Sequence, residues 1–137
     1  MKITQEADYA LRIILFLCQI SSGERVEARV ISESENITLR FSLKILRKLT
    51  KKDLVKSFRG VKGGYMLNKD PKDITLREVV EAIDGPIYVN RCLHDEEYCN
   101  MKRTNTCKIH KALAKIQKTL REELEKVTFK ELLKEKD

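Results

Sequence analysis

Three of the four cysteines lie close together in the sequence and are followed by a histidine. Cys92, Cys99, Cys107 and His110 form the pattern Cys-x6-Cys-x7-Cys-x2-His. Thiolate sulfur and imidazole nitrogen are ligands for both zinc ions and iron–sulfur clusters. Structural zinc sites usually separate paired cysteines by about two to four residues, whereas cluster-binding loops accept wider intervals. The pattern therefore favours an iron–sulfur cluster, with zinc as the alternative.

The residues around these three cysteines are basic, and the fourth cysteine lies in a different setting. Five positive side chains would offset the charge of the thiolates: Arg91, Lys102, Arg103, Lys108 and Lys111. Cys107 stands at the start of a predicted helix, where the helix dipole favours a thiolate. Cys18 lies within an apolar run, which predicts an inert core residue.

The segment from residue 40 to residue 62 is strongly basic. It contains nine lysines and arginines and one acidic residue, Asp53, so its net charge of +8 exceeds the +7 of the whole chain. A solvated helix face normally mixes both signs of charge, so this excess predicts a nucleic-acid partner. With four Phe, four Tyr and no Trp, the chain lacks an aromatic series for stacking single strands. Duplex DNA is therefore favoured over RNA.

The elements predicted around this segment form a helix-turn-helix followed by a β-hairpin. Apolar residues at helical spacing predict helices over residues 4–20, 27–34 and 39–52. The second helix is expected to pack through Ala28, Val30 and Ile31. Residues 54–58 and 65–67 are predicted strands joined by a glycine-rich turn. The third helix is then the recognition helix of the major groove, with the hairpin as a wing beside it.

Position within these elements assigns roles to individual residues. Side chains near the N-terminal end of the third helix are predicted to reach base edges: Thr38, Arg40, Phe41 and Lys44. Those farther along are predicted to contact phosphates: Arg47, Lys48 and Lys51. The wing contributes Arg59, Gly60, Lys62, Gly63 and Gly64. Its arginine can enter a narrow minor groove, and its glycines are expected to permit positive φ and a close backbone approach to DNA.

Beyond the wing, a loop at residues 87–105 separates a helix over residues 75–84 from a long C-terminal helix. From Thr106 onward, apolar residues recur three or four positions apart: Ile109, Leu113, Ile116, Leu120, Leu124 and Val127. A capping-box pattern at Thr128 predicts a short terminal helix. A small domain covers little of this apolar seam and of the apolar helix at residues 4–20. They predict a two-fold homodimer, with packing inside one chain as the alternative.

The predicted fold class is mainly α with a small β-hairpin wing. It consists of a winged helix-turn-helix domain (1–85), a cysteine-containing cluster-binding loop (86–105), and a dimerisation helix with a terminal helix (106–137). A chain of 137 residues is too short for two full cores, and no catalytic constellation predicts an enzyme. The longest uncharged stretch has eleven residues, 13–23, against about 20 needed to cross a bilayer. We therefore expect a cytoplasmic protein with no membrane partner.

The sequence resembles the IscR and NsrR group of winged-helix transcription regulators, also called the Rrf-two family, over nearly the whole chain. The resemblance rests on residues 1–4 and 8–12, on the wing at 59–67, on residues 74–85, on the three cysteines, and on Thr128-Phe129. It implies a homodimer that binds a palindromic promoter site. It also implies one iron–sulfur cluster per subunit, held by the three cysteines and controlling DNA affinity in response to redox state, nitric oxide or iron–sulfur status.

The resemblance leaves two residues as the fourth ligand. The end of the cysteine pattern is similar to that of IscR, where a histidine, here His110, completes a two-iron cluster. Asp8 occupies the position from which NsrR-like proteins supply a carboxylate to a four-iron cluster in the partner subunit. Two other functions stay open: a cluster-free, zinc- or thiol-based regulator of the same fold, as in CymR-like relatives, and a basic structural protein that binds RNA or an acidic protein.

Overall fold

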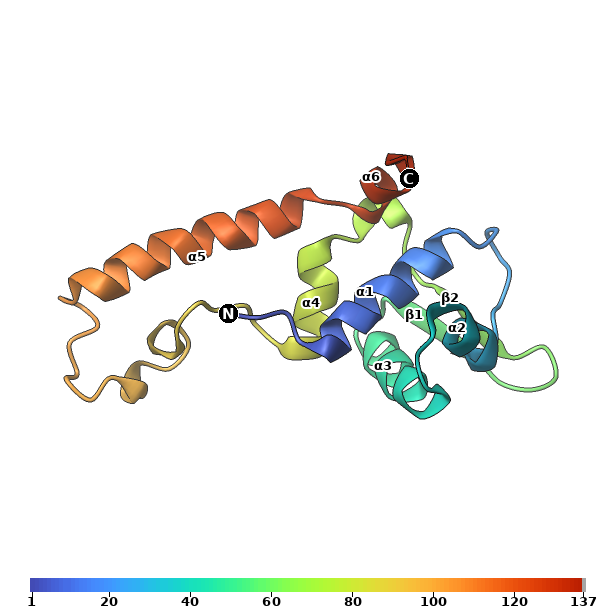
Figure 1. Cartoon of the computed structure of the whole chain (residues 1–137), viewed down its shortest axis with the longest axis horizontal. Helices are drawn as coiled ribbons and strands as arrows, with labels where there is room; N and C mark the ends of the chain where they lie inside the picture. Colours follow the sequence, from blue (N-terminus) through green and yellow to red (C-terminus); the bar gives the residue numbers. More distant parts are fainter. Residues whose placement is uncertain (137) are drawn as a thin grey trace.

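The computed structural model describes residues 1–136, which contain six α-helices and one two-stranded antiparallel sheet (Figure 1). The helices are α1 (Gln5–Cys18), α2 (Ala28–Glu35), α3 (Leu39–Lys51), α4 (Leu76–Asp84), α5 (Lys108–Lys126) and α6 (Phe129–Lys134). The strands are β1 (Val55–Phe58) and β2 (Gly64–Leu67), and short 3-10 turns lie at Pro71–Asp73, Arg91–Leu93 and Glu96–Tyr98. None of the helices in this part of the chain combines the length and the apolar character that a membrane span needs. The predicted fold class is confirmed.

Four of the helices begin at a threonine. The capping residues are Thr4 (α1), Thr38 (α3), Thr75 (α4) and Thr128 (α6). In each, the side-chain hydroxyl accepts a hydrogen bond of 3.1–3.2 Å from the backbone N–H three residues later. Such a cap satisfies an otherwise unpaired donor and contributes about 1 kcal/mol to helix stability. The helix starts predicted at these positions therefore have a local cause.

The core is built around α1, which α2, α3, α4 and α6 all contact (Figure 1). Its buried residues recur at helical spacing: Ala7, Ala10, Ile13, Ile14 and Leu17. Ile45, Leu46 and Leu49 of α3 are fully buried in the same core. The apolar helix expected at residues 4–20 is thus largely covered within one chain.

Three residues connect α2 to α3 and set the helix-turn-helix. Asn36 ends α2 in the left-handed conformation, with φ 53° and ψ 47°. The Ser32 hydroxyl donates a hydrogen bond to the carbonyl of Ile37, a buried residue of the turn. The expectation that Val30 packs inward is wrong, because Ala28 and Ile31 occupy the inner face of α2 and Val30 lies exposed.

The wing is the β1–β2 hairpin beside α3. Its register pairs Val55 with Leu67 and Phe58 with Gly64. A bridge between Val26 and Tyr65 ties β2 to the segment before α2. The hairpin is therefore held along β2 by the segment before α2. Its turn at residues 59–63 projects from the domain (Figure 1).

The C-terminal end of the chain returns to the first domain. Phe129 of α6 is fully buried in the core that contains α1 and α3, and Thr128 forms a bridge with Thr75. α5 extends away from the domain as a long rod (Figure 1). The predicted division into 1–85, 86–105 and 106–137 stays a prediction. Although α6 belongs to the third of these segments, it packs against the core of the first.

The C-terminal half of α5 is hydrogen-bonded to the segment that follows α4, and this segment is hydrogen-bonded to α4. Arg121 Nε donates to the Ile87 carbonyl at 2.8 Å, and the Ile87 N–H donates to Glu81 Oε2 at 3.0 Å. Three residues of the predicted seam are half-buried: Leu113, Leu120 and Leu124. Two others, Ile109 and Ile116, are 69% and 56% exposed. The chain itself therefore covers part of this apolar seam, and Ile109 and Ile116 remain uncovered.

Candidate nucleic-acid interface and metal centre

One side of α3 is basic and faces solvent. Arg40, Lys44, Arg47 and Lys51 follow one another at intervals of four, three and four residues, and all are exposed. The opposite side carries the buried residues described above, which fix the orientation of the helix. The structure thus brings these four predicted DNA-contacting residues into a single stripe.

An acidic residue of α1 contacts two lysines of α3. Glu6 lies 3.5 Å from Lys44 Nζ and 2.5 Å from Lys48 Nζ. Burial alone would raise the pKa of Glu6, but the hydrogen bonds and charges of Lys48 and Lys44 outweigh it and lower the pKa. Glu6 is therefore an anion that positions both lysines, and nothing in the sequence spacing indicated this contact.

Two residues predicted to reach base edges support the helix in the structure. The Thr38 hydroxyl caps α3 by accepting from the Phe41 N–H at 3.2 Å. The Phe41 ring is half-buried and packs edge-to-face against Tyr9, with ring centroids 5.4 Å apart. Thr38 thus stabilises the start of α3 and Phe41 packs it against α1, and Arg40 and Lys44 lie at the exposed side of the helix.

The wing glycines differ in what requires them. Gly60 has φ 94° and open space around it, as expected for a residue in the projecting turn. The expectation of positive φ is wrong for Gly63. There, a Cβ atom would lie 2.7 Å from the Phe58 carbonyl oxygen, so the close approach is to the wing's own backbone. Gly64 has φ 145°, and a Cβ atom there would lie 2.8 Å from the Val26 carbonyl oxygen.

An arginine outside the predicted interface fastens the wing. The Arg25 guanidinium lies over the Phe58 ring at 3.6 Å from its centroid. It also donates to the Lys62 carbonyl at 3.2 Å. These contacts orient the turn that carries Arg59 and Lys62, which are both exposed. Sequence reasoning missed Arg25 because its partners lie more than 30 positions away in the chain.

The cysteine site is partly assembled at the start of α5. Cys92 Sγ lies 3.2 Å from His110 Nδ1, and Asn90 Nδ2 donates to the same sulfur at 3.4 Å. Cys107 is the N-cap of α5, and its sulfur accepts from the His110 N–H at 3.5 Å. The structure therefore brings the Cys92 sulfur to the His110 ring, whereas the Cys107 sulfur contacts the backbone of His110.

Cys99 lies in a separate turn of the same loop. Backbone N–H groups of Arg103 and Met101 hydrogen-bond its sulfur and lower the pKa of the thiol. Within residues 1–136, no three His, Cys, Asp or Glu side chains converge closely enough to form a ligand group for a metal ion. Asp8, the other predicted ligand, lies exposed on α1 with Arg12 Nε at 4.0 Å.

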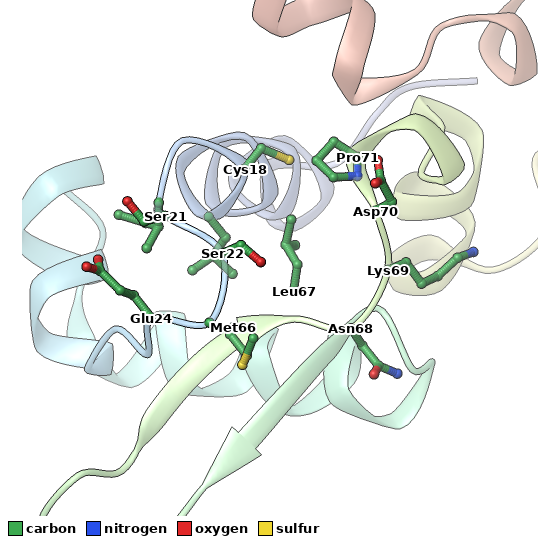
Figure 2. A pocket seen from close by; sticks show the side chains of 13 residues that line it. Cys18, Ser21, Ser22, Glu24, Met66, Leu67, Asn68, Lys69, Asp70 and Pro71 are labelled. Atoms are coloured by element: carbon green, nitrogen blue, oxygen red, sulfur yellow. The ribbon is translucent and has the colours of Figure 1, made fainter.

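Cys18 lies away from this loop, at the edge of a cavity of about 510 Å³. Figure 2 shows the cavity between the end of α1, the loop at residues 21–24 and the chain that leaves β2. Burial, with a smaller contribution from the negative charge of Asp70, raises the pKa of Cys18 to about 12. Cys18 therefore remains a protonated thiol, as an inert structural cysteine should.

Comparison with known proteins places the chain among transcription regulators. A model of the Rrf2 family, described as an iron-dependent transcriptional regulator, matches residues 3–135. An HTH-type transcriptional regulator of Haemophilus influenzae is 30% identical over 100% of this chain and 89% of its own length. The prediction that the chain is not an enzyme is confirmed by these matches.

Solved structures have the same fold. CymR, the global cysteine regulator of B. subtilis, superposes with a TM-score of 0.79 and 25% identity, over 100% of this chain and 99% of that chain. IscR of T. potens superposes with a TM-score of 0.71 and 22% identity, over 98% and 87% of the two chains, and at this identity indicates the fold alone. Since the family model covers all but the ends of the sequence, the chain belongs to the Rrf2 (Rrf-two) family of transcriptional regulators.

Proposed function

We propose that this regulator binds duplex DNA as a homodimer, with α3 of each copy in the major groove and the wing beside it. The observation that carries the proposal is the exposed stripe of Arg40, Lys44, Arg47 and Lys51 on a helix anchored in the core. A fixed helix with positive side chains on its free face is suited to phosphate and base contacts together. As a DNA-binding regulator it would act in the cytoplasm.

The proposed contacts divide along the helix and the wing. Arg40 and Lys44, near the N-terminal end of α3, would reach base edges, and Arg47, Lys48 and Lys51 would contact phosphates. Arg59 and Lys62 extend the positive surface at the wing turn, where Gly60, Gly63 and Gly64 keep the backbone compact. Thr38 and Phe41 act by holding the start of α3.

The proposed dimer uses the uncovered face of α5. Ile109 and Ile116 are seven residues apart, so they lie on one face of the helix, and both are exposed. Joining two copies through this face would give the complex a two-fold axis. The preferred DNA site would then be palindromic, with half-site centres about 34 Å or a multiple of it apart.

The donor set at the cysteines is suited to an iron–sulfur cluster. Cys92, Cys99 and Cys107 would hold it, with His110 or the partner subunit's Asp8 as the fourth ligand. A bound cluster supplies a centre that oxidants and nitric oxide modify. The Cys92–His110 contact and the position of Cys107 at the start of α5 support this assignment. The loop would have to bring Cys99 toward them, and the choice between two-iron and four-iron types follows the fourth ligand.

The connection from this site to α3 runs through α5 and α4. Cys107 begins α5, and Arg121 of α5 bonds Ile87, which in turn bonds Glu81 of α4. α4 contacts both α1 and α3. A change of the cysteine loop that tilts α5 would therefore displace the two recognition helices of the dimer relative to each other, and DNA affinity would depend on the state of the loop.

The test combines a spectrum with DNA binding. Protein purified without oxygen should be brown, with comparable iron and acid-labile sulfide. Cys92→Ala, Cys99→Ala and Cys107→Ala should each abolish the colour, and Cys18→Ala should spare it. Loss or spectral change in His110→Ala but not in Asp8→Ala would indicate the histidine ligand, and the reverse result the carboxylate.

For DNA, fluorescence anisotropy should give an affinity that depends on the state of the cluster. If about 6–10 phosphates are neutralised, a plot of log affinity against log salt should have a slope of about −5 to −9. Lys48→Ala should make that slope shallower on all sequences, whereas Arg40→Ala should weaken the preferred site by about 1–3 kcal/mol. Salt-insensitive binding or a monomeric complex would contradict the proposal.

A cluster-free regulator of the same fold is the second proposal. One observation favours it: the fold is shared with CymR, a global cysteine regulator, over 100% of this chain and 99% of that chain. Control would then act through the thiols or through zinc. Colourless protein that binds duplex DNA after anaerobic reconstitution with iron and sulfide would decide for this alternative.

A further inference from the structure

Two leucines lie beside the basic stripe of α3. Leu39 and Leu43 are 40% and 38% exposed, although they stand on the helix with the densest positive charge in the chain. They are four residues apart and therefore lie one above the other on the same face. Together with Arg40, Lys44 and Arg47 they line a shallow hollow of about 850 Å³. This leucine pair is the apolar floor of an otherwise cationic surface.

Packing within the domain does not account for the leucine pair. The inner face of α3 consists of Ser42, Ile45, Leu46 and Leu49, all fully buried. Phe41 at the edge is already in contact with Tyr9. The pair therefore contributes little to the core, and its side chains are free to contact a partner whose charge complements the surrounding cations.

A partner that fits this surface has negative charges opposite the arginines and the lysine and an apolar group opposite the leucines. In the major groove of duplex DNA, phosphates flank the base edges, and the C5-methyl of thymine is the apolar group that the edges present. Arginine and lysine beside the leucines can satisfy the phosphates and the polar edges. A leucine side chain between them can contact a methyl group but can make no hydrogen bond to guanine or cytosine.

We propose that Leu43, with Leu39 beside it, contacts thymine C5-methyl groups in the major groove and makes the protein select thymine at those base pairs. This rests on the proposed function, since it requires α3 to enter the major groove. Four residues of α-helix rise about 6 Å, and base pairs of B-DNA are spaced about 3.4 Å apart. The two leucines should thus address thymines about two base-pair steps apart.

The test removes only the methyl group. Duplexes of 30 base pairs enriched from a random pool by the full-length protein are resynthesised with deoxyuridine in place of each thymine in turn. The wild-type protein should lose about 3- to 10-fold in affinity at one or two thymines of each half-site. Leu43→Ala should bind the thymine and deoxyuridine duplexes equally at one of these positions, and Leu39→Ala at the other.

Matched variants separate the leucine contact from general damage. Leu43→Gln retains length and helix propensity but replaces the apolar end, so it should also lose the distinction, and circular dichroism melting verifies its fold. Leu43→Met and Arg40→Ala should retain the difference in affinity between the thymine and deoxyuridine duplexes. If no duplex is enriched, the proposed DNA binding itself fails. If duplexes are enriched but deoxyuridine is tolerated everywhere, or the sensitivity survives in both Leu43→Ala and Leu43→Gln, the thymine contact is overturned while DNA binding stands.

Discussion

At the scale of single residues, the cysteines fall into two chemical classes. Cys99 has backbone N–H donors around its sulfur, which lower the pKa of the thiol and favour the thiolate. Cys18 is packed against the core at the end of α1, and burial raises its pKa to about 12. The thiolate is the form that both binds metals and reacts with electrophiles. The environment thus separates a cysteine that favours the thiolate from one that stays protonated.

In metal-free protein at pH 7.5, iodoacetamide should modify Cys99 at least tenfold faster than Cys18, because the thiolate fraction at Cys18 is very small. Peptide mass spectrometry over a time course measures both rates. In guanidinium chloride the two rates should become similar, since the folded environment is lost. Equal rates in the folded protein would contradict the assignment of Cys18 as a protected thiol.

In the proposed DNA complex, Glu6 would compete with DNA for two lysines of α3. It lies against Lys44 and Lys48 from the neighbouring α1. Replacing it by glutamine removes a negative charge beside the proposed phosphate contacts. Glu6→Gln should therefore raise the affinity for random-sequence duplex about two- to tenfold at 0.1 M salt, with the gain shrinking as salt is increased. Anisotropy titrations at several salt concentrations measure this effect, and Glu33→Gln, an exposed carboxylate on α2, is the control.

The same contact predicts a pH dependence of stability. The Glu6 pKa is lowered in the folded protein from its ordinary value of 4.5. The ionised carboxylate therefore contributes stability above pH 4.5, and this contribution is lost as the pH falls through the folded-state pKa. Glu6→Gln should lose less unfolding free energy than the wild type below pH 4.5. Urea titrations at pH 6 and at pH 3.5 measure the difference, and parallel curves for the two proteins would exclude this role.

At the scale of elements, the helices depend on one another through a few contacts between distant segments. α6 is only six residues long, too short to be stable by itself, and it is held because Phe129 enters the core against α1. The wing is likewise a two-stranded hairpin that is marginal alone. Its bridge from Val26 and the stacking of Arg25 on Phe58 compensate for this. Both short elements are thus stabilised by contacts with distant segments of the chain.

Truncating Phe129 tests whether α6 is part of the DNA-binding domain. Phe129→Ala removes a fully buried ring and should lower the free energy of unfolding by about 3–5 kcal/mol. Leu133→Ala, an exposed position of the same helix, should change it by less than about 1 kcal/mol. Denaturant titration followed by circular dichroism measures both. A small effect of Phe129→Ala would mean that α6 is not integral to this core.

At the scale of the whole molecule, α5 extends from the folded domain and carries exposed apolar residues. Arg121 and Gln117 fasten α5 to the segment 87–89, while Ile109 and Ile116 remain exposed. A long helix with one apolar face free is suited to pairing with a second copy. The proposed role of α5 therefore predicts that the protein is a dimer in solution.

The double variant Ile109→Glu, Ile116→Glu places like charges in the proposed interface and should convert a dimer into a monomer. Sedimentation equilibrium or light scattering measures the mass, and circular dichroism verifies that the helix content is retained. The monomer should bind duplex DNA with roughly half the salt slope of the dimer, since it contacts half as many phosphates. Lys118→Glu, at an exposed polar position of α5, changes the net charge of each chain by the same two units as the double variant and should remain dimeric.

Local patterns of the sequence determined the elements and the basic surface. Threonine caps and apolar periodicity are properties of neighbouring residues, so the starts of α1, α3, α4 and α6 follow from them. The stripe on α3 is equally local, because residues three and four apart share a helix face. The glycine-rich turn likewise predicted the hairpin, and the resemblance to the Rrf-two family agreed with the whole arrangement.

Only the tertiary structure decided which distant residues meet. Glu6 with Lys48, Arg25 with Phe58, Cys92 with His110, and Phe129 with the core join segments that are far apart in the chain. Such contacts depend on how helices and strands pack, and packing is set by the shape and burial of many side chains at once. No short spacing in the sequence encodes it, because the free energy that selects these pairs belongs to the whole core.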